Sequence, residues 1–290
     1  MALVSSSPCS SRPFPTSERW NCRLSSSSSA SYLHTSMAVS RRLRCRPIAV
    51  SSSSLCTENH TIPPLPPPPP AIDHSAVSVA EAFAEDQLWA ASCLRVRSFY
   101  EFDPTSYRIE DHKKHLAERE FEALKERIAG KRDEFRRVSC INATVPLSKI
   151  SNLSDDLCSS CKFSYNGEDR VVIGTLDLNQ CLRLPDEIVG KKPEGIRADF
   201  ARAYLSNVCV AAELHRNGLG YAVIAKSKLV AQEWGISDLY VHVAVNNEPA
   251  KKLYLKSGFV YESDEPAWQA RFLDRPQRIL LWTGLPGVQL

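Results

Sequence analysis

A glycine-containing segment in the second half of the chain has the composition of an anion-binding turn. Residues 202–211 form an apolar, strand-like run, and residues 221–233 carry apolar side chains at helical spacing. The turn between strand and helix contains Gly218 and Gly220, and the helix after it has its apolar positions at Val223, Ile224 and Leu229. The first N–H groups of a helix have no intrahelical acceptor, and the helix dipole is positive there. The segment is therefore suited to hold a phosphate group.

Two common phosphate-binding motifs do not fit this turn. A P-loop ends in Gly-Lys-Ser/Thr, whereas Tyr221 follows Gly220 here. A dinucleotide-binding fold requires Gly-x-Gly-x-x-Gly after its first strand, and only Gly218-x-Gly220 is present. Neither motif explains the turn.

A third pattern fits, and a second motif downstream supports it. The stretch 215–220, His-Arg-Asn-Gly-Leu-Gly, resembles the pyrophosphate-binding turn of the GNAT superfamily of acetyl-CoA-dependent N-acetyltransferases, Arg/Gln-x-x-Gly-x-Gly/Ala. His215 departs from this pattern at the first position. The family's second signature, Asn-x-x-Ala-x-x-x-Tyr-x-x-x-Gly-Phe, is matched in register by Asn247, Ala250, Tyr254, Gly258 and Phe259. The resemblance covers about residues 76–284 and implies an α+β GNAT fold, a mixed central β-sheet flanked by helices.

The resemblance also implies acetyl-CoA as cosubstrate and assigns residues to it. The backbone of Val208, Cys209 and Val210, at the end of the central strand, would pair with the pantetheine arm like an added strand. Asn247 would contact the cofactor, although its place at the start of a helix also suits an N-cap. No metal is implied. The amides expected to hold the pyrophosphate belong to Arg216, Asn217, Gly218, Leu219, Gly220 and Tyr221.

Acetyl transfer to an amine needs a proton donor for the thiolate and an acceptor for the amine proton. In the family a tyrosine at the position of Tyr254 reaches the sulfur and acts as general acid; the alternative is an aromatic ring that only packs. No carboxylate lies on strand 203–211 to act as base. Tyr204 and His242, on neighbouring predicted strands, resemble the water-relay base of certain protein N-terminal acetyltransferases. In that role His242 would titrate near the ordinary pKa of ~6.5. Alternatively, both side chains are ordinary strand and core residues.

The acceptor pocket of the superfamily is usually formed by two loops, which correspond here to residues 100–109 and 263–277. Their acidic residues Glu101, Asp103, Asp264 and Glu265 would suit a cationic amine, although such charges are more often only solvated. Plastid relatives of this type resemble protein acetylases, so we expect protein N-termini and lysines as substrates. A small-amine acetyltransferase of arylalkylamine or polyamine type, or a non-catalytic acetyl-CoA-binding module, are the alternatives.

The elements that position these residues follow from periodicity. Helices are expected at residues 79–100 and 109–128, and strands at 140–147, 170–178, 202–211 and 239–245. Asn166-Gly167 predicts a two-residue hairpin before the second strand. Together with the helix after Gly220 and the short helix carrying Tyr254, these elements form one domain, residues 74–290.

The first 73 residues have a different composition. Residues 1–57 contain 18 serines, seven arginines and one acidic residue, Glu18, and show no apolar period. This is typical of a disordered transit peptide, and its serine runs favour the chloroplast stroma over the mitochondrion. The prolines of residues 58–73 indicate an extended linker. No apolar run is long enough to span a membrane.

The charges and cysteines of the remaining chain exclude two further classes. The net charge of +3 comes from the arginine-rich tail, so the domain is slightly acidic and nucleic acid is not an expected partner. Four of the ten cysteines lie in the tail, and the other six are dispersed over a domain large enough to have its own core. A reduced compartment fits this pattern better than a disulfide framework. Cys158-x-x-Cys161 has no second pair, so we interpret it as a chance spacing or a surface turn.

Overall fold

The computed structural model describes residues 72–103, 105–132, 135–150, 153–181 and 201–286. The predicted transit peptide and all of the linker before residue 72 lie outside the described residues. The described residues form strands and helices that build one mixed sheet flanked by helices, the architecture that the sequence resemblance implies. The helices are α1 (Glu85–Phe99), α2 (Ile109–Ile128), α3 (Asp155–Ser160), α6 (Leu219–Glu233), α7 (Glu248–Lys256) and α8 (Ala267–Phe272).

Eight strands form the sheet in the order β1-β2-β4-β5-β6-β8-β7, with β3 added as a hairpin on β4. Only β5 and β6 run parallel among these pairs of neighbours, and the other described pairs are antiparallel. The strands are β1 (Ser78–Glu81), β2 (Phe135–Pro146), β3 (Lys162–Tyr165), β4 (Glu168–Cys181), β5 (Arg202–Val210), β6 (Asp238–Ala244), β7 (Val260–Asp264) and β8 (Arg278–Gly284).

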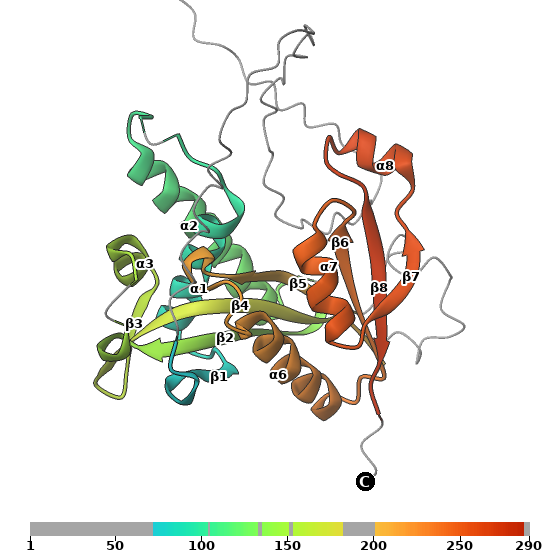
Figure 1. Cartoon of the computed structure of the whole chain (residues 1–290), viewed down its shortest axis with the longest axis horizontal. Coiled ribbons are helices and arrows are strands. Elements are labelled where there is room, and N and C mark those ends of the chain that lie inside the picture. Colours follow the sequence, from blue (N-terminus) through green and yellow to red (C-terminus); the bar gives the residue numbers. More distant parts are fainter. Residues whose placement is uncertain (1–71, 104, 133–134, 151–152, 182–200, 287–290) are drawn as a thin grey trace, which may run out of the picture. The chain divides into compact units, whose positions relative to one another are not determined.

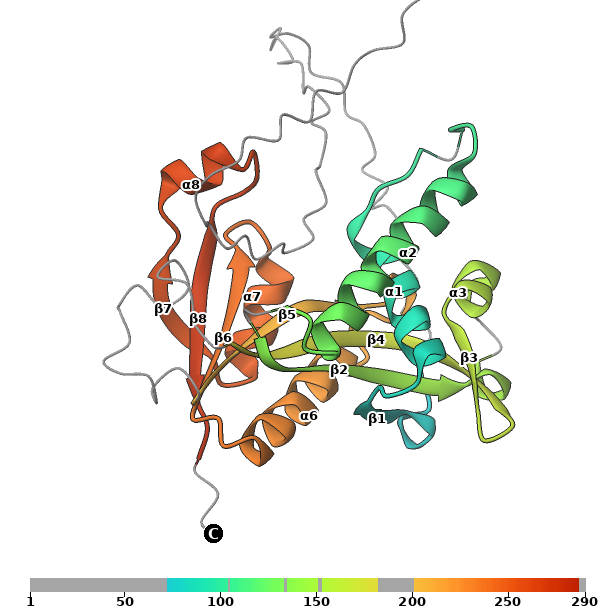
Figure 2. The ribbon, with the colours of Figure 1, turned by 180° about the vertical axis from the view of Figure 1, so that it is seen from behind.

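Helices cover both faces of the sheet. Figures 1 and 2 show α1 and α2 over one face of β2, β4 and β5, and α6 beneath the other face. The core between these layers consists of buried aliphatic side chains such as Leu94, Ile141 and Leu176. α7 lies beside α6, where the Lys228 ammonium donates to the carbonyl of Ser257 over 2.6 Å. The residues with expected roles in chemistry lie between these layers, on β5, β6 and α7.

Short sequence motifs predict the ends of several elements correctly. Asn166 and Gly167 both have positive φ, 51° and 79°, and connect β3 to β4 in the two-residue hairpin that the sequence predicts. Asn247 caps α7, because its side chain accepts from the backbone N–H of Ala250 over 3.1 Å. Gly218 precedes α6 with a left-handed φ of 74°.

The first predicted helix is shorter than expected. Residues 78–81 form β1, an antiparallel partner of β2, and the helix begins only at Glu85. The Gln87 side chain accepts from the backbone N–H groups of Phe83 and Ala84, which satisfies donors at the start of the helix. Pairing with a distant strand therefore overrides helical spacing over four residues.

The two cysteines of the Cys158-x-x-Cys161 motif lie in and just after α3. Cys161 is buried in the main hydrophobic core, whereas Cys158 is half-buried. All five cysteines whose side chains are described are free thiols. Burial raises the pKa of Cys161 to about 11, which makes it an unreactive core residue.

Candidate active site

The site is created by the separation of two parallel strands in the middle of the sheet. Residues 202–205 of β5 pair with residues 238–241 of β6, but β5 continues to Val210 and β6 to Ala244 without further pairing between these two strands. A bulge lies at the point of separation, since between Thr175 and Asp177 β4 advances two residues while β5 passes three. Beyond the bulge β5 keeps β4 on one side, and no strand among the described residues pairs with its other edge. The edge of Val208, Cys209 and Val210 is thus available to an extended ligand.

The open edge leads to the glycine turn. In the described part of the chain, no acceptor bonds the amides of Leu219, Gly220 and Tyr221, and no side chain caps α6. Arg216 and Gly218 both have positive φ, and the Asn217 side chain donates to the carbonyls of Leu214 and His215. This folds the turn back on the end of β5 and points three free donors away from the helix. An anionic group is the complementary ligand.

The two glycines of the turn serve different purposes. Gly218 is required by its backbone conformation, since nothing lies within 4 Å of the position that a Cβ would take. A Cβ on Gly220 would instead meet the Leu253 methyl group Cδ2 at 2.9 Å. Gly220 therefore allows the start of α6 to approach α7 closely, which brings the glycine turn beside the helix that carries Tyr254.

Tyr204 and His242 lie together, as their positions on neighbouring strands predict. In the β5–β6 register Tyr204 stands opposite Tyr240, and His242 is two residues further on the same face of β6. The Tyr204 hydroxyl and His242 Nδ1 are 3.1 Å apart, within hydrogen-bond distance. The pair lies where β5 and β6 begin to separate.

The protonation state of His242 differs from that of an ordinary histidine. Burial, reinforced by the positive charge of Arg278, lowers its pKa to about 3. The imidazole is therefore neutral throughout the physiological range, and the expectation that it titrates near pH 6.5 is wrong. A neutral ring keeps a lone pair available to a hydrogen-bond donor.

Tyr254 projects from α7 into the same region. Its ring is 6% exposed and packs edge-on against Phe259 at a centroid distance of 5.7 Å. Burial, with smaller contributions from Tyr204 and Cys209, raises the pKa of Tyr254 above its ordinary value. The hydroxyl therefore keeps its proton at neutral pH, as a general acid must.

One expected cofactor contact has a competing partner. The Val210 carbonyl lies 3.1 Å from Nε2 of His215, the residue that departs from the family pattern. His215 thus ties the turn to the end of β5. Sequence reasoning treated His215 only as a mismatch, because the bond spans a turn whose course the sequence does not specify.

The acceptor side of the site is less acidic than the sequence suggests. Glu265 is buried and bonds Arg275 and Arg278, so its charge is neutralised inside the protein. Burial opposes ionisation, but the hydrogen bonds from Arg275 and Arg278 lower its pKa to about 2. These three residues join the two ends of the segment that carries α8. Their charges also act on His242. Glu265 is therefore structural and does not belong to an acidic mouth.

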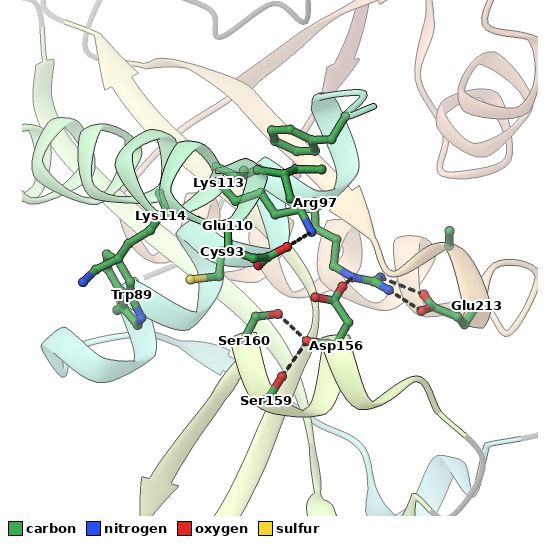
Figure 3. Close-up of a pocket in the computed structure, with 15 residues that line it drawn as sticks. Trp89, Cys93, Arg97, Glu110, Lys113, Lys114, Asp156, Ser159, Ser160 and Glu213 are labelled. Carbon is green, nitrogen blue, oxygen red and sulfur yellow. Dashed lines mark hydrogen bonds and ion pairs between the residues drawn. The ribbon is translucent and has the colours of Figure 1, made fainter. Parts of the chain in front are cut away.

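A cavity of about 700 Å³ lies between α1, α2 and α3. It borders both ends of the loop between α1 and α2, through Phe102 and Ile109, but no residue of 263–277 lines it. It therefore does not correspond to the predicted acceptor pocket. As Figure 3 shows, Arg97 crosses this cavity to reach Asp156 and Glu213. Because Glu213 lies three residues after the end of β5, the ion pair anchors the segment between the strand and the glycine turn to α1.

A buried polar network beneath the bulge was not anticipated. It joins Arg95 of α1 and Arg127 of α2 to Asp177 of β4. One signal was present in the sequence: an arginine between Leu94 and Val96, on the apolar face of a helix, and an aspartate inside an apolar strand. Such residues are almost never buried unless they pair with each other.

Comparisons with known proteins show the family to which this chain is similar. Residues 142–259 match the profile of the acetyltransferase (GNAT) family. The chain is 62% identical, over 89% of both sequences, to GCN5-related N-acetyltransferase 7, chloroplastic, of Arabidopsis thaliana. It is 29% identical, over 67% of both sequences, to GCN5-related N-acetyltransferase 6, chloroplastic, of the same plant. Among solved structures, the acetyltransferase of GNAT family from Streptococcus pneumoniae is 17% identical, with a TM-score of 0.40 over 72% of this chain and 99% of that chain.

Gly220 allows a test of whether the turn binds an anion. Gly220→Asp and Gly220→Asn introduce the same steric conflict with Leu253, but only aspartate adds negative charge beside the free amides. We expect the aspartate variant to bind coenzyme A at least ~10-fold more weakly than the asparagine variant, because like charge opposes the pyrophosphate. Calorimetric titration measures both constants. Equal affinities for the two variants would show that no phosphate approaches this turn.

Proposed function

Because this chain belongs to the GNAT family of acetyltransferases, we propose that it transfers the acetyl group of acetyl-CoA to amines of proteins, at N-termini, lysines or both. The observation that carries this proposal is the convergence of three features at the separation of β5 from β6. These are the open strand edge, the turn with free amides and the buried Tyr254 hydroxyl. Each feature meets one requirement of thioester aminolysis.

The residues present fit acetyl-CoA, which supplies an activated acetyl group as a thioester. The unpaired edge of Val208, Cys209 and Val210 would bind the pantetheine arm as an added strand. The turn from Arg216 to Tyr221 would hold the pyrophosphate through its backbone amides. The Asn247 side-chain oxygen already caps α7, so a cofactor contact would fall to its amide nitrogen.

Tyr254 is proposed as the general acid that protonates the departing thiolate. Its pKa is raised, so the hydroxyl is fully protonated and can donate when the thiolate forms. Tyr204 and neutral His242 are proposed to hold a water molecule that receives the amine proton. Since His242 has a pKa of about 3, it serves as a fixed hydrogen-bond partner and not as a titrating base.

Exposed aromatic side chains favour a polypeptide over a small amine as acceptor. Trp268 and Phe272 are 64% and 74% exposed, and they are one turn apart on α8. This helix lies in the segment between Glu265 and Arg275, whose charges act on His242. Large exposed aromatic residues are costly in solution and are typical of surfaces that contact another protein. A small diffusible amine would make no use of them.

The experiment that tests the function combines the full chain, acetyl-CoA and three acceptor pools: peptides with a free N-terminus, N-terminally blocked peptides with lysine, and polyamines. We expect mass spectrometry to detect acetylated peptides. Tyr254→Phe should lower kcat by ~10²-fold or more with little change in coenzyme A affinity, because only the hydroxyl is removed. Acetylation of polyamines alone would make the protein a small-amine acetyltransferase. Coenzyme A binding without transfer to any pool would leave a non-catalytic module.

The roles of Tyr204 and His242 predict a particular pH dependence. Tyr204→Phe and His242→Gln should each lower kcat/KM nearly as much as the double change, because both residues hold one water. A plot of kcat/KM against pH should still fall at acidic pH in His242→Gln. His242 is already neutral above pH of about 3, so this acidic limb reflects protonation of the acceptor amine. Rate measurements from pH 6 to 9 test this. Additive losses, or a limb that disappears in His242→Gln, would exclude the relay.

We also propose that the protein works in the chloroplast stroma. Both Arabidopsis relatives carry "chloroplastic" in their names, and residues 1–57 have the composition of a transit peptide. A fluorescent reporter fused to residues 1–57 should accumulate in chloroplasts of plant cells. A matched fusion with its seven arginines changed to glutamine should remain outside, because import sequences require positive charge. Reporter fluorescence in the cytosol or in mitochondria would contradict the proposal.

A further inference from the structure

A cluster of charged side chains lies in the interior directly behind the bulge of β5. Asp177 of β4 is fully buried and accepts two hydrogen bonds from Arg95, of 2.5 Å to Oδ1 and 3.1 Å to Oδ2. Arg127 of α2 approaches Oδ2 at 3.0 Å. Arg95, also fully buried, further donates to Thr175 Oγ1 over 3.3 Å. Two helices and the sheet are thus tied together at this carboxylate.

The carboxylate has one more partner, which belongs to β5. Asn207 donates from Nδ2 to Asp177 Oδ2 over 2.8 Å. Asn207 is inside the bulge and has a left-handed φ of 53°, a conformation that a residue in a regular strand does not adopt. Asparagine tolerates this conformation better than most residues, but it still needs contacts that hold it there.

A second side chain of β4 supports the same stretch of backbone. Asn179, two residues after Asp177 and therefore on the same face, donates to the Tyr204 carbonyl and the Ser206 hydroxyl, each over 3.0 Å. Arg127 reaches the Asn179 oxygen at 3.5 Å. The network thus donates to Tyr204 and Ser206 and accepts from Asn207, on both sides of Leu205, the last residue of β5 that pairs with β6.

The position of these bonds matters for the proposed cofactor site. β5 is paired with β6 up to Leu205, and its free edge begins immediately afterwards. A shift of the bulge by one residue would reverse the faces of all following side chains and move the free backbone groups. It would also change the distance between Tyr204 and the open edge. The site thus depends on where the bulge is fixed.

We propose that Asp177, held by Arg95 and Arg127, and its partner Asn207 are positioning residues that fix the point at which β5 leaves β6 and thereby set the affinity for acetyl-CoA. The inference rests on the proposed function, because it assigns the open edge to that cosubstrate. Arg95 and Asp177 are fully buried, and the Arg127 side chain is 16% exposed, so they would act through the backbone of β5 and not on the reacting atoms.

The test compares two left-handed asparagines. Asn207→Gly keeps the freedom to adopt positive φ and removes only the bond to Asp177, and Asn207→Asp keeps the shape but places a carboxylate against Asp177. We expect both to raise the dissociation constant of coenzyme A and the KM for acetyl-CoA about tenfold, with kcat at saturation changed less than about threefold. The control is Asn166, which has nearly the same φ of 51° in the distant β3–β4 hairpin. Asn166→Gly and Asn166→Asp should leave all three constants unchanged.

A second measurement separates this inference from the proposed function. Amide hydrogen exchange without any ligand should become faster over residues 206–210 in Asn207→Gly, and remain unchanged over residues 168–172 of β4. Wild-type coenzyme A binding together with wild-type exchange in Asn207→Gly would overturn the inference and leave the function intact. Failure of the unmodified protein to bind coenzyme A would instead overturn the function, and the exchange result alone would then decide whether Asn207 fixes the strand.

Discussion

A strand that leaves its neighbour in the middle of a sheet exposes backbone groups that would otherwise be hydrogen-bonded, and this chain maintains such a separation between β5 and β6. Beyond the bulge β5 stays paired with β4, which holds the strand on the side opposite the opening. The placement of Tyr204, His242 and Tyr254 around one space follows from this opening. The glycine turn also depends on it, since the turn begins where the freed strand ends.

The buried ion pair of Arg95 and Asp177 is an expensive way to stabilise a fold. Removing two charges from water often costs more than their attraction returns, and apolar side chains of similar volume are commonly as stable. An ion pair has one advantage over apolar packing, because its hydrogen bonds have defined directions. A carboxylate that bonds Arg95, Arg127 and Asn207 at once fixes three elements in one register, which aliphatic packing would not specify. Burial opposes ionisation of Asp177, but the two arginines lower its pKa, so the network remains charged at neutral pH.

The sequence predicted features that depend on near neighbours. The Asn166-Gly167 hairpin, the Asn247 cap and the start of α6 after Gly218 each follow from a few consecutive residues. Features that depend on distant partners were missed or misjudged. Residues 78–81 have helical spacing but pair with β2, and Glu265 looks solvent-facing until Arg275 and Arg278 fold over it. The network of Arg95, Asp177 and Asn207 joins residues up to 112 positions apart, so only its unusual charges, and not its geometry, can be seen in the sequence.

The low pKa of His242 bears on how an amine could react in this site without a strong base. Burial and the neighbouring Arg278 disfavour a positive charge on the imidazole. The same environment would disfavour the ammonium form of any amine brought beside it, so an acceptor would tend to lose its proton to solvent on entry. A weak acceptor, such as the water proposed between Tyr204 and His242, would then be enough to receive the remaining proton after attack. Tyr254 lies in the same dry region, where burial keeps its hydroxyl protonated and able to neutralise the thiolate. Desolvation alone therefore adjusts both ends of the proposed reaction in the required direction, because it favours the neutral amine and the neutral phenol together.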